Sequence, residues 1–132
     1  MKIYIVTRNL LISSLIFAVG NIFSETFNLA QEKKKIDQLL EIVKKSDTNF
    51  YRNGEKHTSK KAAAHLKFKY NRAKNKFVFF GPETKYSARE FIDKIATKSS
   101  TTGKPYFVEL SGQQVKVGDW LHQKLKDIET KK

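Results

Sequence analysis

The chain has 132 residues and no cysteine, and its 26 basic against 13 acidic residues give a net charge of +13 with the histidines neutral. The lack of cysteine excludes a disulfide framework, thiolate metal ligands and a lipidated cysteine. A positive balance favours anionic partners, such as nucleic acid, phospholipid or lipopolysaccharide head groups, or an acidic protein. The richness in Lys, Asn, Ile and Phe is also what an AT-rich coding sequence gives without selection for a ligand.

Residues 1–24 have the pattern of a secretory signal peptide. Lys2 and Arg8 stand at the start without an acidic residue, a mostly apolar run follows at 10–20, and small residues come next. An uncleaved anchor is the alternative, but this run is shorter than the roughly 20 apolar residues of a span. We expect cleavage, and a mature domain (25–132) without a transmembrane span. Loss of the leader's two basic residues leaves that domain a net charge of +11.

Two helices are predicted in the first half of this domain. The first covers residues 33–47, where Ile36, Leu39, Leu40 and Val43 recur at the spacing of one helical face. The turn pair Asn53-Gly54 then breaks the pattern. The second helix covers 59–75, with Ser59 as its expected N-cap. Its predicted buried stripe is Ala62, Leu66, Tyr70, Ala73 and Phe77.

The second half is predicted to alternate between helix and strand. Residues 77–83 form a short strand or a buried loop, and 87–98 form a helix with Ser87 and Glu90 in capping-box spacing. Segments 105–110 and 113–117 flank Ser111-Gly112 and predict a β-hairpin. A last helix (118–132) carries Trp120 on its apolar stripe, so we expect Trp120 to be buried. The predicted fold is a small, helix-rich α+β domain of about four helices, with one hairpin packed on them.

Several separated motifs follow one another along the mature chain: Arg52-Asn53-Gly54, His65-Leu66 with Lys69, the segment from Lys98-Ser99-Ser100 to Gly103-Lys104-Pro105-Tyr106, and Trp120-Leu121. Through these residues the chain, from about Ile36 to Leu125, resembles the YfeK-like family of small exported bacterial proteins, a domain of unknown function. The resemblance implies a periplasmic location in a Gram-negative envelope. It implies no activity, because the family has none established.

The Thr-Gly-Lys step at residues 102–104 is not a nucleotide-binding P-loop. Lys98 stands where the first glycine of that motif belongs, Pro105 replaces the Ser or Thr, and the predicted order is helix, loop, strand. The hydroxyls around it still suit a weaker anion site. The alternative is a purely structural loop, in which Ser and Thr cap the preceding helix and Gly103 adopts a left-handed conformation.

The second helix offers a further cationic surface. Lys61, His65, Lys69 and Arg72 lie on one of its faces. These neighbours are expected to lower the pKa of His65 and favour its neutral form. A solvated basic face beside the core is the alternative. If the two segments converge, the composite anion site consists of Arg52, Asn53, His65, Lys69, Ser99, Ser100 and Lys104.

Catalytic residues, metal ligands and cofactors are not predicted. The three histidines (His57, His65 and His122) are scattered, no serine lies in a G-x-S-x-G motif, and Glu90 and Asp93 point away from their helix's apolar stripe. We therefore expect a non-enzymatic binding module for an anionic envelope component. One alternative is a structural or protein-interaction module. The other is a nucleic-acid binder, suggested by the basic and aromatic residues that alternate in 65–80. The pattern leaves the oligomeric state open.

Overall fold

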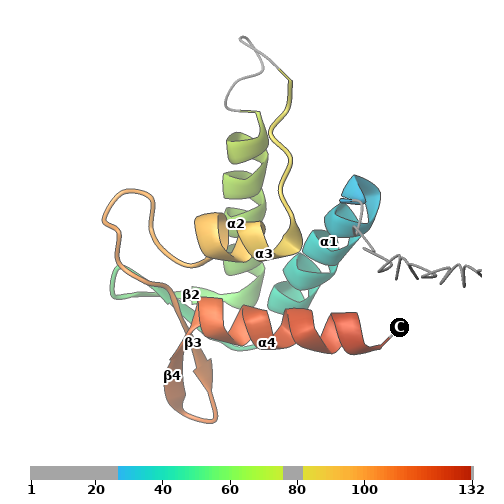
Figure 1. Cartoon of the computed structure of the whole chain (residues 1–132). Helices are drawn as coiled ribbons and strands as arrows, with labels where there is room; N and C mark the ends of the chain where they lie inside the picture. Colours follow the sequence, from blue (N-terminus) through green and yellow to red (C-terminus); the bar gives the residue numbers. More distant parts are fainter. Residues whose placement is uncertain (1–26, 76–81, 132) are drawn as a thin grey trace, which may run out of the picture.

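Helix α1 (Leu29–Lys45) begins at Asn28, whose side chain accepts a hydrogen bond from the Gln31 N–H. The computed structural model describes residues 27–75 and 82–131 (Figure 1). The predicted leader and most of the predicted strand or buried loop at 77–83 lie outside the described residues. The elements after α1 are β1 (Asn49–Arg52), β2 (Glu55–Thr58), α2 (Ser59–Lys74), α3 (Ala88–Phe91), the π-helix η1 (Ile92–Ala96), β3 (Phe107–Leu110), β4 (Gln113–Lys116) and α4 (Val117–Thr130).

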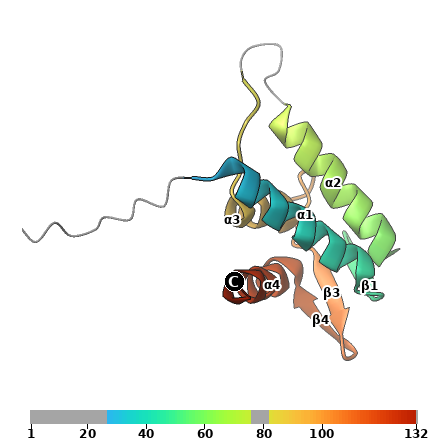
Figure 2. The same ribbon diagram turned by 90° about the vertical axis from the view of Figure 1, so that its right-hand side faces the viewer.

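The helices occupy the predicted places, although α1 begins four residues before the predicted start at residue 33. Two further differences concern α2 and the predicted third helix. Thr58, not Ser59, is the N-cap of α2: its hydroxyl accepts from the Lys61 N–H, while buried Ser59 donates to the carbonyl of Lys44. The predicted third helix is α-helical only through α3, where Ser87 and Glu90 do form the capping box, and then widens into the π-turns of η1. Together the helices form the larger part of the domain (Figure 2).

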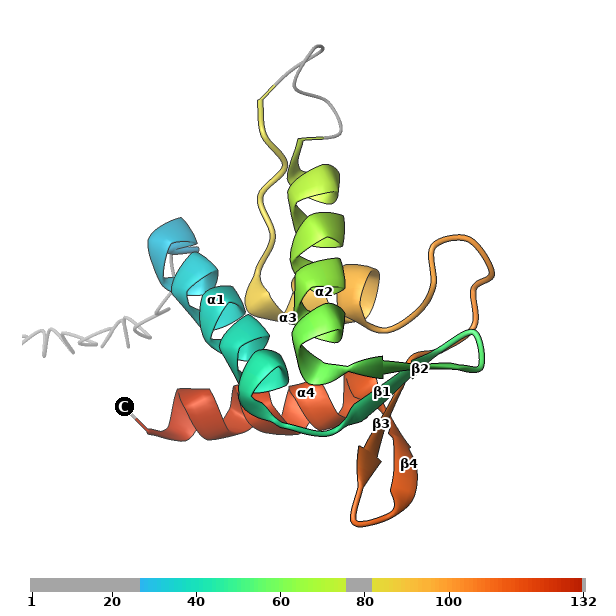
Figure 3. The same cartoon turned by 180° about the vertical axis from the view of Figure 1, so that it is seen from behind.

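The strands form two hairpins, of which the sequence analysis predicted only the second. They join into one antiparallel sheet in the order β2-β1-β3-β4. Phe50 of β1 pairs with Val108 of β3 in the middle, and the hairpins diverge from this short central contact (Figure 3). Each hairpin continues directly into a helix, α2 or α4. The domain therefore contains the same hairpin–helix unit twice, although no sequence repeat is evident.

The core lies between the helices and one face of this sheet. Ile36, Leu39 and Val43 of α1 are fully buried, as their spacing predicted. Trp120 of α4 is also buried, and its ring packs edge-on against Phe50 with the centroids 5.8 Å apart. The helix-rich α+β prediction is thus confirmed, but the hairpins build a four-stranded sheet rather than resting separately on helices.

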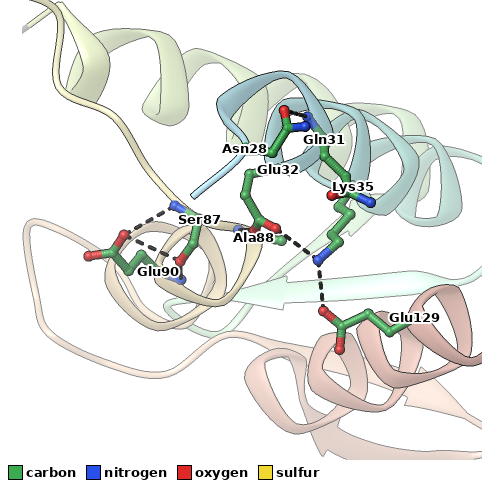
Figure 4. A network of polar contacts seen from close by, with 8 residues as sticks. All are labelled: Asn28, Gln31, Glu32, Lys35, Ser87, Ala88, Glu90 and Glu129. Carbon is green, nitrogen blue, oxygen red and sulfur yellow. Dashed lines mark hydrogen bonds and ion pairs between the residues drawn. The ribbon is translucent and has the colours of Figure 1, made fainter. Parts of the chain in front are cut away.

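A polar network ties α1 to the starts and ends of other helices (Figure 4). Glu32 accepts from the Ala88 N–H at 2.7 Å, which supplies an acceptor to the N-terminus of α3. Lys35 donates to Glu32 at 2.8 Å and to Glu129 of α4 at 2.9 Å. The network holds α1, α3 and α4 together at the end of the domain opposite the hairpins.

Candidate functional site

A pocket of about 230 Å³ opens between the helix-facing side of the first hairpin and α2. Its polar lining includes Arg52 and His57 of the strands, Lys61 and His65 of α2, and Tyr106 just before β3. Its apolar lining includes Phe50, Ala62, Leu66 and Val117. We call this cavity the Arg52 pocket. Arg52 faces α2 because it lies two residues after buried Phe50, on the same side of the strand.

Arg52, His65 and Tyr106 form a hydrogen-bonded chain along the pocket. Arg52 Nη1 lies 3.1 Å from His65 Nδ1 and 3.3 Å from Nε2, and Nε2 lies 3.2 Å from the Tyr106 hydroxyl. Because a guanidinium only donates, Nδ1 is the natural acceptor. The proton of the neutral ring then sits on Nε2 and is donated to Tyr106.

His65 is held in this neutral form by its surroundings. Burial lowers its pKa from the ordinary 6.5, and the positive charges of Arg52 and Lys69 lower it further. The direction agrees with the expectation from the sequence. Burial, however, is the largest cause, and the cation that the expectation for this pKa did not include is Arg52, which comes from the neighbouring strand.

The ammonium of Lys69 is hydrogen-bonded to acceptors of the protein itself. It donates to the carbonyls of Ile95 at 2.6 Å and Lys98 at 2.7 Å, and to the Tyr106 hydroxyl at 3.3 Å. Burial, followed by the charge of Arg52, lowers the pKa of Lys69 to about 8, whereas the three acceptors favour the ammonium. Since an ammonium has three N–H groups, Lys69 has none left for a ligand.

The Ser-rich loop between η1 and β3 is closed by its own hydrogen bonds. The N–H of buried Ser99 donates to the Lys104 carbonyl at 2.9 Å, and the Gly103 N–H returns to the Ser99 carbonyl at 2.9 Å. The Ser99 hydroxyl accepts from the backbone N–H groups of Thr101 and Thr102. These contacts match the structural alternative for this loop.

The loop and the first hairpin nevertheless meet, as the composite site required. The Thr102 hydroxyl donates to the Asn53 side-chain oxygen at 2.6 Å, which joins the loop to the hairpin tip (Figure 3). Arg52, His65 and Lys69 gather around Tyr106. Five of the seven predicted residues do not line the pocket: Asn53, Lys69, Ser99, Ser100 and Lys104.

Sequence reasoning missed Tyr106, His57 and Lys61 as pocket residues. Tyr106 was placed only in the hairpin and in a segment that carries the family resemblance, and its burial raises its pKa. His57 is placed by the unpredicted strand β2, where it pairs across from Phe50. Lys61 was placed on the basic face of α2. The neighbouring strand β2, which makes this face one wall of the pocket, was not predicted.

Neither a metal cluster nor a membrane-spanning helix is found in residues 27–75 and 82–131. Those residues contain no group of three or more His, Asp or Glu side chains arranged to hold a metal ion. No described helix is both long enough and apolar enough to cross a bilayer. His122 of α4 instead pairs with Asp93 at 2.6 Å.

Comparison with known proteins places these features in a family. Residues 30–129 match the model of a family of unknown function, DUF5329. The chain is 37% identical over 78 residues to the uncharacterized protein YfeK of Salmonella typhimurium, a match that spans 58% of each chain. No solved structure matches significantly. Because the family model covers most of its length, the chain belongs to the DUF5329 family, the YfeK-like proteins of unknown function.

Proposed function

We propose that the protein is an exported, periplasmic, non-catalytic binding module that takes an anionic envelope component into the Arg52 pocket. The observation that carries this proposal is the guanidinium of Arg52, which forms no ion pair with any carboxylate in the described part of the chain. A half-buried cation without a counter-ion is costly, and a bound anion would remove that cost. Arg52 can offer a planar pair of N–H donors to such a ligand.

In this proposal, two residues contact the anion directly. Arg52 is the anchor and Tyr106 supplies a hydroxyl, whereas His65 and Lys69 position these two groups. The exposed Lys61 at the pocket wall adds long-range attraction. The remaining predicted residues support the loop and the hairpin tip that border this region.

The binding proposal is tested by titrating the purified protein with small anions of different chemistry, followed by nuclear magnetic resonance of the His65 and Tyr106 side chains. Inorganic phosphate, acetate, hexanoate and hexyl phosphate form a suitable panel. We expect at least one to bind with salt-sensitive affinity, and Arg52→Gln to abolish binding. Lys67→Gln is the matched control, because it removes one charge from an exposed position of α2. Failure of every anion to bind would reject the proposal.

Export is the part of this proposal that depends on the leader. We expect the protein recovered from the cell envelope to begin between about residues 21 and 26. Mass spectrometry of that material measures its N-terminus directly. An intact leader in the envelope fraction would show that cleavage does not occur.

A second candidate, a protein-interaction module, is favoured by an open groove between α1 and α4. Its apolar floor includes Ile42, Leu110, Trp120 and Ile128, and lysines such as Lys34 and Lys131 stand on its rim. Chemical crosslinking in envelope fractions, followed by identification of the captured proteins, tests this candidate. Crosslinks from Lys34 or Lys131 that persist in Arg52→Gln would favour it over the pocket.

A further inference from the structure

We propose that the ligand of the Arg52 pocket is a monocarboxylate with an apolar carbon chain. This inference deepens the proposed function and rests on it. Its physical basis is the number of free donors in the pocket, their geometry, and the apolar wall beside them.

The free donors suit one negative charge. Among the cations around Tyr106, Lys69 donates its three N–H groups to the carbonyls of Ile95 and Lys98 and to the Tyr106 hydroxyl. His65 uses one ring nitrogen on Arg52 and the other on Tyr106. Arg52 is therefore the one guanidinium or ammonium among these groups with donors to spare. A single charge balances a carboxylate, whereas a phosphate dianion would also need the exposed Lys61 of the pocket wall.

The arrangement of those donors fits a planar anion. Only Nη1 of Arg52 is hydrogen-bonded to His65, so the edge formed by Nε and Nη2 has no partner in the described residues. That edge presents two parallel N–H groups, which match the two oxygens of a carboxylate. The Tyr106 oxygen accepts from both His65 and Lys69, and this directs its own O–H to a third acceptor. A carboxylate oxygen can provide that acceptor.

The rest of the pocket is suited to a carbon chain. Phe50, Ala62, Leu66 and Val117 form a continuous apolar lining next to the polar groups. The volume of about 230 Å³ exceeds the roughly 150 Å³ of an engineered cavity that binds benzene, yet lies below the usual range for drug-sized ligands. A carbon chain of roughly five to eight atoms would fit such a volume. Among the described residues, buried His57 Nε2 has no hydrogen-bond partner, and Glu55 Oε2 lies 3.8 Å away from it. It can therefore also bond a polar atom on such a ligand.

Two sources offer this chemistry: a free short-chain acid, or the C-terminal residue of a peptide that ends in an apolar side chain. Calorimetric titration of the purified protein with five compounds separates them. Hexanoate, hexyl phosphate and hexanol vary the head group on one chain. N-acetyl-leucine and its amide test the peptide end with and without the carboxylate.

We expect hexanoate to bind at least about tenfold more tightly than hexyl phosphate or hexanol. Arg52→Gln should weaken hexanoate binding about tenfold or more, because a charge-assisted pair is lost. Tyr106→Phe should weaken it several-fold, and Lys67→Gln should leave it unchanged. Thermal unfolding of each variant establishes that the fold is intact.

The outcomes separate this inference from the broader proposal. Tighter binding of hexyl phosphate would overturn the carboxylate assignment while leaving an anion-binding pocket. Equal binding of hexanol, or no binding at all, would overturn both. Binding of N-acetyl-leucine but not its amide would support the carboxylate and identify a peptide end as the source. Binding of hexanoate alone would support it and identify a free acid.

Discussion

At the residue scale, Lys69 connects helix α2 to the end of η1, where Ile95 lies 26 residues further along the chain. It satisfies the carbonyls of Ile95 in η1 and of Lys98 just after it, where the end of a helix leaves backbone acceptors without intrahelical partners. Its ammonium also lies over the Tyr106 ring, with Nζ 5.0 Å from the ring centre. A lysine of a helix thus takes the role of a C-terminal cap for another helix.

Replacement of Lys69 by Met should destabilise the domain. The variant keeps an unbranched side chain but leaves the Ile95 and Lys98 carbonyls without this donor, at a cost of about 1–3 kcal/mol. Urea denaturation measures the difference in free energy of unfolding. Lys67→Met is the matched control on the exposed side of the same helix, and we expect little change there. Equal stability of both variants would contradict the capping role.

His65 makes stability depend on pH in a defined window. Its pKa is lowered in the folded protein, so the unfolded chain binds a proton at higher pH than the folded one. Stability is therefore fully present above pH 6.5 and falls as the pH drops below this value, until the folded-state pKa is passed. Urea midpoints between pH 8 and 5 should show this decline, and His65→Gln should flatten it.

The carboxylates act in a separate, more acidic range. A hydrogen bond from Lys94 lowers the pKa of Glu90, and one from the Tyr51 hydroxyl lowers that of Glu109. Stabilisation from these groups is present above about pH 4.5 and is lost as the pH falls below it. A decline between pH 8 and 5 that persists unchanged in His65→Gln would assign the effect to another group.

At the element scale, both hairpins turn through left-handed residues. Ser111 and Gly112 have φ values of 50° and 76°, and Asn53 and Gly54 have 52° and 83°. Two successive positive φ values are typical of the type I′ turn, whose twist matches that of the strands.

Substitutions at residues 111 and 112 should therefore have different effects. Gly112→Ala should cost about 1–2 kcal/mol, because an L-residue is strained in the left-handed region. The cost arises from the backbone alone, since a Cβ at Gly112 meets nothing within 4 Å. Ser111→Gly relieves the same strain, so it should not lower the midpoint of thermal unfolding. Destabilisation by Ser111→Gly but not by Gly112→Ala would rule out this turn.

The elements that the sequence predicted are those whose own residues determine them. The stripe of α1 and the capping box of Ser87 and Glu90 are local patterns, and both hold in the structure. Strand β2 reads Glu-Lys-His-Thr, without an apolar residue, so it forms because β1 pairs with it and α2 continues from it. The end of η1 also has a partner from outside the helix, since the Ile95 carbonyl accepts from Lys69 of α2.

The candidate site follows the same division. The shared face of His65 and Lys69 could be predicted from helical spacing, and so could a lowered pKa for His65. Lys69 is already hydrogen-bonded to the carbonyls of Ile95 and Lys98, which lie 26 and 29 residues further along the chain. Helical spacing alone cannot predict contacts over such a separation. The pocket itself required strand β2 and Tyr106, because they form the walls opposite α2.

At the scale of the whole molecule, Trp120 joins the second hairpin–helix unit to the first. Its ring lies edge-on to Phe50 of β1 and is only 9% exposed. Trp120→Ala should reduce the free energy of unfolding by about 3–5 kcal/mol, as measured by urea denaturation. Phe68→Ala is the control: Phe68 is 62% exposed, so we expect a change within about 0.5 kcal/mol. Similar small losses in both variants would contradict the observed packing.

The strand order has a consequence for the rate of folding. Each hairpin closes through a two-residue turn, an event that takes roughly 1–10 μs. The central pairing of Phe50 with Val108 joins residues from opposite halves of the chain, so its loop-closure entropy must be overcome before the contact stabilises anything. We therefore expect the slow kinetic step to be the docking of two preformed hairpins. A substitution at Val108 should then slow refolding more than one at either turn.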